Sequence, residues 1–89
     1  MIFKDYYKIL GLETNKVNID EIKVAFREQA KKYHPDVNAG REAEERFKDI
    51  NEAYRILTNN KSRRKYDRIW YSYVGKKIDK QKEKEKEIN

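Results

Sequence analysis

The stretch "KKYHPDVN", residues 31–38, holds the side chains best suited to chemistry in this 89-residue chain. His34 is its only histidine, Pro35 is its only proline, and Asp36 follows directly. A neutral imidazole offers one donor and one acceptor, a carboxylate can pair with an arginine of another protein, and proline stiffens the loop. These three residues alone favour a simpler alternative over a docking point, and only their position after a basic helix, at the tip of a hairpin, makes docking on a partner protein the preferred interpretation. The simpler alternative is a helix stop followed by an aspartate that caps a turn, with His34 an ordinary exposed histidine.

Enzymatic and metal chemistry have little support in the sequence. A histidine base would need a nucleophile, but the chain has no cysteine, and Ser62 and Ser72 lie in no recognisable nucleophile elbow. A metal site would depend on one histidine and on carboxylates that lack ligand spacing. No glycine-rich phosphate loop is present. We therefore expect no enzyme, no bound metal and no cofactor.

A helix is predicted to lead up to His34, from Asn18 to Tyr33. Asn18 and Glu21 form a capping-box-like pair, and Val17 and Ile22 are spaced as a hydrophobic staple. One arc of this helix is apolar, with Ile22, Ala25, Phe26, Ala30 and Tyr33. About 130° away lies a basic stripe of Lys23, Arg27 and Lys31. We expect the apolar arc to face the core and the stripe to face an acidic partner, although a solvated helix face is the usual fate of such residues.

Gln29 is a misfit, because it falls inside the apolar arc of this helix. An unpaired amide would cost about 1–3 kcal/mol there if it were fully buried. Either the amide finds a hydrogen-bond partner or it lies near the rim of the core.

Pro35 ends the helix, because proline disfavours α conformation at the preceding His34. After a loop to about Gly40, a second helix is predicted from Arg41 to about Thr58. Its apolar residues recur at spacings of 4, 3, 4 and 3, as Ala43, Phe47, Ile50, Tyr54 and Leu57. A short loop makes two such helices antiparallel neighbours. His34, Pro35 and Asp36 are therefore expected at the tip of a helical hairpin.

Two shorter helices are predicted outside the hairpin. The first runs from about Asp5 to Leu10, where Gly11 can end it. The other is "KSRRKYDR", with Tyr66 and Ile69 turned inward. Its secondary basic patch of Lys61, Arg63 and Arg64 has three interpretations: a second contact patch, a nucleic-acid site, or a charged helix that only covers the hairpin.

The overall composition favours one small all-α domain. Apolar residues make up 37% and charged residues 43% of the chain, which has only three glycines and carries a net charge of +6. No apolar run is long enough to span a membrane or to form a signal peptide, so the cytoplasm is the expected location.

The last part of the chain is expected to differ from the first. We divide the sequence into a domain at residues 1–70 and a charged extension at 71–89. "IWYSYV" is apolar and either packs on the body or serves a neighbouring segment. From Lys76 onward the tail is a solvated helix rich in Lys and Glu or is disordered, and we favour fraying.

Four segments together resemble the J-domain of DnaJ-type co-chaperones. They are "DYYKILGL", "EIKVAFREQAKKYHPDVN", "AEERFKDINEAYRIL" and "SRRKYD", in that order and spacing, over about residues 4–68. The resemblance implies a four-helix fold whose second and third helices form the hairpin. It also implies docking on a DnaK-type heat-shock chaperone and stimulation of its ATP hydrolysis, in protein folding and the stress response.

Residue by residue, the resemblance implies that the His-Pro-Asp tripeptide triggers ATP hydrolysis by the partner chaperone. The partner-binding set is then His34, Pro35, Asp36, Asn38, Lys23, Arg27 and Lys31. Gln29 stands where the family usually has leucine, and Glu28 is negative where some members are basic. No Gly/Phe-rich linker and no zinc-binding cysteines follow, so we expect the excised head of a longer J-protein rather than a minimal one, with unfolded clients bound by a region not present.

Nucleic-acid binding is the rival function. It would use the Asn18–Tyr33 helix and the patch from Lys61 to Arg68, with steep salt dependence and indifference to His34. We regard nucleic acid as the less favoured partner and expect no membrane partner.

Overall fold

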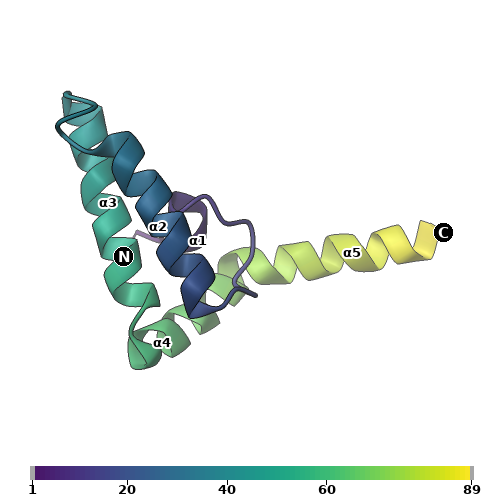
Figure 1. The fold of residues 1–89 in the computed structure, drawn as a ribbon. Coiled ribbons are helices and arrows are strands. Elements are labelled where there is room, and N and C mark those ends of the chain that lie inside the picture. Colours follow the sequence, from purple (N-terminus) through teal and green to yellow (C-terminus); the bar gives the residue numbers. More distant parts are fainter. Residues whose placement is uncertain (1, 89) are drawn as a thin grey trace.

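The computed structural model describes residues 2–88, with side chains up to residue 82. This part of the chain is helical and contains no strand. Its elements are α1 (Tyr6–Ile9), α2 (Ile19–Tyr33), α3 (Arg41–Leu57), α4 (Asn60–Trp70), a π-helical turn η1 (Tyr71–Gly75) and α5 (Lys76–Ile88). In Figure 1, α2 and α3 lie side by side as a hairpin with α1 against them, while α4, η1 and α5 form one long helical rod that leaves the body.

The hairpin begins and ends where local chemistry predicts. The side chain of Asn18 accepts a hydrogen bond from the Glu21 N–H at 2.8 Å and caps α2. The helix stops after Tyr33, and His34 is extended, with φ −62° and ψ 138°, as expected before Pro35. The predicted boundaries of α2 are therefore confirmed.

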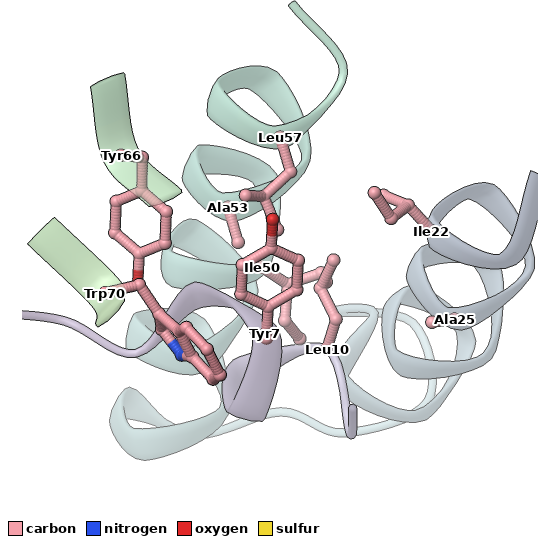
Figure 2. Packing of buried hydrophobic residues seen from close by; sticks show 9 residues of the cluster. All are labelled: Tyr7, Leu10, Ile22, Ala25, Ile50, Ala53, Leu57, Tyr66 and Trp70. Atoms are coloured by element: carbon pink, nitrogen blue, oxygen red, sulfur yellow. The ribbon is translucent and has the colours of Figure 1, made fainter. Parts of the chain in front are cut away.

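The core lies where α1, α2, α3 and α4 meet. Figure 2 shows its buried side chains, which are Tyr7, Leu10, Ile22, Ala25, Ile50, Ala53, Leu57, Tyr66 and Trp70. The predicted apolar arc of α2 does face this core, with Ile22 and Ala25 buried and Phe26 packed against the cluster. The α3 seam is also confirmed, since Ile50 and Leu57 are almost fully buried.

The end of α4 differs from the prediction. Tyr66 is buried as expected, but Ile69 is 37% exposed and Trp70 takes the inward position. Trp70 lies one helical turn after Tyr66, on the same face, and its Nε1–H donates to Asp5 Oδ1 at 2.9 Å. The prediction for Ile69 was wrong because the indole finds both apolar neighbours and a polar partner in the N-terminal segment.

The segment after Trp70 is helical. The backbone continues through η1 into α5, which runs to Ile88. Gly75 is buried, and a Cβ there would come within 2.9 Å of the Trp70 ring and 2.8 Å of the Tyr71 ring. Ile78 packs against the core cluster, so α5 is docked on the body at its base. The backbone from Lys76 to Ile88 is helical, whereas fraying of the tail and the division of the chain at residue 70 stay predictions.

None of the helices within residues 2–88 is long and apolar enough to cross a bilayer.

Candidate partner-docking site

The tip of the hairpin is a single helical turn that begins at His34. The carbonyl oxygen of His34 accepts the N–H groups of Val37 and Asn38, each at 2.9 Å. Its imidazole Nδ1 accepts the Asp36 N–H at 3.1 Å. Pro35 occupies the first position of the turn, where a missing N–H costs nothing and the fixed φ of proline fits a helix. In this helical turn, His34 therefore takes the cap position, Pro35 the first position and Asp36 the second.

The simpler alternative for the tripeptide, a helix stop followed by a capped turn, is thus partly right, but the capping residue is not the aspartate. His34, and not Asp36, caps the turn. The Asp36 side chain is 88% exposed, and its carboxylate lies 3.6 Å from His34 Nδ1, beyond hydrogen-bond range. The Asp36 carboxylate is consequently exposed to solvent at the tip.

The base of the tip is held by an aromatic contact. The rings of His34 and Phe47 lie 5.6 Å apart between centroids and are nearly perpendicular, at 77°. Phe47 is half-buried on α3, across the loop from the histidine. Sequence periodicity placed Phe47 in the hairpin seam, but did not connect it with His34.

The basic stripe lies on the outer face of α2, as predicted. Lys23, Arg27 and Lys31 are exposed, and none of them forms an ion pair with the part of the chain that the structure describes. Lys31 lines one shallow hollow together with His34, Asp36 and Val37. The stripe and the tip are therefore continuous at this end of α2.

Two exposed apolar side chains accompany these charges. Val37, at the tip, is 75% exposed, and Val24, on α2, is 52% exposed. Asn38 is exposed beside them. Val37 was missing from the predicted site, since a single valine in a loop carries no sequence signal of its own.

The secondary basic patch is smaller than predicted. Lys61 and Arg64 are exposed, but the Arg63 side chain is only 20% exposed. Its guanidinium donates to the carbonyl oxygens of Asn15 (3.2 Å) and Val17 (2.6 Å), and its Nε donates to the Tyr7 hydroxyl. Arg63 therefore connects α4 with the segment before α2, and placing it on an exposed patch was wrong.

A metal centre has no candidate in this arrangement. Among the residues whose side chains are described, no three acidic or histidine side chains are grouped so as to hold an ion.

The fold and the tip define a helical J-domain, and comparison with known proteins gives the same class. The DnaJ domain profile matches residues 5–67, so the chain belongs to the DnaJ domain family. It is similar to "Chaperone protein DnaJ" of Campylobacter hominis (60% identical over 65 residues, 72% of this chain), of Clostridium tetani (58% over 67 residues, 74%) and of Chlorobium chlorochromatii (52% over 73 residues, 81%). In each case the match covers 18% of the relative.

Proposed function

We propose that this chain is a co-chaperone module that docks on a DnaK-type heat-shock chaperone, stimulates its ATP hydrolysis and so assists protein folding. The observation that carries the proposal is the exposed His34-Pro35-Asp36 turn at the end of an exposed basic stripe in a DnaJ-family domain. The relatives named above are chaperone proteins, in agreement with this role. We place the activity in the cytoplasm.

The module supplies no chemistry of its own in this proposal. It acts by binding the hydrolysis-competent state of the partner more tightly than its other states, because a ligand shifts an equilibrium only through such a difference in affinity. The Asp36 carboxylate would pair with an arginine of the partner, in a charge-assisted hydrogen bond.

The basic stripe would guide the encounter. Three exposed cations, none of them in an ion pair with residues 2–82, give α2 an outer face that attracts an acidic surface and speeds association. Docking should weaken as salt increases, because ions screen exposed charges. An affinity independent of salt would contradict this part of the proposal.

Single-turnover ATP hydrolysis by a DnaK-type chaperone is the test. The native chain should accelerate hydrolysis, and His34→Gln and Asp36→Asn should each lower the stimulation by about tenfold or more, the size expected for one charged hydrogen bond. Circular dichroism should show both variants folded. Full stimulation by Asp36→Asn would show that the charge is not needed.

The His34→Gln variant also distinguishes the co-chaperone function from nucleic-acid binding. Lys61 and Arg64 remain exposed for it, although Arg63 is engaged inside the domain. If no DnaK-type chaperone responds, while DNA or RNA binds with a steep salt dependence and equally well to His34→Gln, the rival function replaces the proposed one.

A further inference from the structure

The two ring nitrogens of His34 have different surroundings. Nδ1 faces the backbone of its own turn and accepts the Asp36 N–H at 3.1 Å. Nε2 has no hydrogen-bond partner among residues 2–82, and the side chain is 48% exposed. One nitrogen is therefore occupied within the protein and the other is available to a partner.

The Asp36 N–H decides which nitrogen carries the proton. A neutral imidazole has one protonated and one bare nitrogen, and only the bare one can accept a hydrogen bond. If Nδ1 were protonated, its proton would face the amide proton of Asp36. The Asp36 carboxylate, at 3.6 Å from Nδ1, is too far away to compensate by accepting a hydrogen bond.

Phe47 fixes the plane of the imidazole. Its ring is nearly perpendicular to that of His34 at a centroid distance of 5.6 Å, an arrangement that aromatic pairs favour. Because Phe47 is half-buried on α3, this contact limits rotation of the exposed histidine about its side-chain bonds. The direction in which Nε2 points is then set by a residue of the other helix.

We propose that His34 works as the neutral tautomer protonated on Nε2, whose Nδ1 caps the tip turn and whose Nε2–H is the donor offered to the partner, with Phe47 as its positioning residue. The importance of this donor for stimulation rests on the proposed co-chaperone function. The tautomer itself is a property of the isolated domain, so the two claims can fail separately.

Nitrogen NMR of the ¹⁵N-labelled chain alone tests the tautomer. At pH 8, where histidine side chains are generally neutral, Nδ1 should have a pyridine-like shift and Nε2 a pyrrole-like shift. The Asp36 amide should show coupling or exchange protection as a donor to Nδ1. A pyrrole-like Nδ1, or shifts averaged between the two tautomers, would overturn the assignment.

Two substitutions at His34 separate the cap from the donor. Asparagine places an oxygen near the position of Nδ1 and can keep the cap, but it has no group at the position of Nε2. The His34→Asn variant should therefore retain the coupling or exchange protection of the Asp36 amide, while its stimulation of ATP hydrolysis should be about tenfold lower than that of the native chain. His34→Gln should lose that coupling or protection. Native-like stimulation by His34→Asn would exclude the Nε2–H as the required donor.

Phe47→Leu tests the positioning role, and Phe26→Leu is its matched control. Both phenylalanines are half-buried in the hairpin, but Phe26 packs on Tyr54, with ring centroids 4.1 Å apart, and not on His34. Phe47→Leu should shift the His34 nitrogens towards averaged values and reduce stimulation severalfold, while Phe26→Leu should leave the shifts unchanged. Unchanged shifts in Phe47→Leu, or equal shifts in both variants, would remove Phe47 from the proposal. The native spectrum decides the tautomer, and His34→Asn decides the donor, independently of the two phenylalanine variants.

Discussion

At the scale of single residues, Gln29 is the clearest departure from an ideal helix face. It is half-buried on α2 beside Gly11, where its Nε2 lies 3.0 Å from the position a Gly11 Cβ would take. Gly11 itself has φ 80°, a conformation suited to glycine, and it follows the end of α1. The Gln29 amide has no hydrogen-bond partner within residues 2–82 and opens onto surface hollows on both sides. It therefore lies at the rim, which is one of the two outcomes that the sequence left open.

Gln29→Leu should stabilise the domain. A half-buried leucine gains about 1 kcal/mol of apolar burial over the amide, and in a domain of this size that raises the melting temperature by about 4 °C or more. Thermal unfolding followed by circular dichroism measures the change. Gln29→Ala, which removes the amide without adding apolar area, should show no such gain; a lower melting temperature for the leucine variant would show that the amide makes a useful contact.

At the scale of elements, the helix starts depend on side-chain caps. Asn59 Oδ1 accepts the N–H groups of Lys61 (3.0 Å) and Ser62 (3.1 Å) at the start of α4. At the start of α2, the Asn18 side chain accepts one N–H group, that of Glu21. By contrast, α3 follows Gly40 without a side-chain cap. The starts of α2 and α4 are thus specified within four residues of chain.

Asn59→Ala should destabilise the domain by about 1 kcal/mol, because two N–H groups lose their acceptor. The neighbouring Asn60→Ala is the matched control, since Asn60 is exposed and its side chain has no hydrogen bond among the described residues. Urea unfolding should give a lower free energy for the first variant only. Equal losses in the two would mean that the cap contributes little.

At the scale of the whole molecule, buried tyrosines connect segments far apart in sequence. The Tyr66 hydroxyl accepts the Tyr6 N–H and donates to the Lys4 carbonyl oxygen, and the Tyr7 hydroxyl donates to Asp67. Burial is the main cause that raises the pKa of Tyr7 and of Tyr66 well above the usual range. Burial and the hydrogen bond to Glu52 raise the pKa of Tyr6 to about 12.

Stability should therefore fall in alkaline solution. Unfolded tyrosines lose their protons near pH 10, whereas these folded tyrosines keep them, so their contribution is complete below about pH 10 and is lost as pH rises through 12 and beyond. Urea unfolding between pH 8 and pH 11 measures the decline. Tyr66→Phe should make it shallower, while Tyr73→Phe, on an exposed ring, should leave it unchanged; a flat profile for the native chain would contradict the burial effect.

Much of the hairpin and its tip could be predicted from sequence, because short-range chemistry governs them. The cap at Asn18, the stop imposed by Pro35 and the periodic apolar faces of α2 and α3 act within one or two helical turns. The same local logic placed His34 and Asp36 at the tip and left Lys23, Arg27 and Lys31 on the outer face. Their role towards a partner stays a prediction.

Only the tertiary structure decided how distant residues share their partners. Arg63 was assigned to the basic patch, but its guanidinium donates to the carbonyl oxygen of Asn15, 48 positions earlier in the chain. Trp70 takes the inward position expected for Ile69, because its indole N–H donates to Asp5. The ring of Phe47 contacts that of His34 across the loop. A periodic pattern tells which face of a helix is apolar, but it does not tell which groups of another helix that face will meet. Those contacts depend on the relative placement of all the helices, which packing of the common core determines.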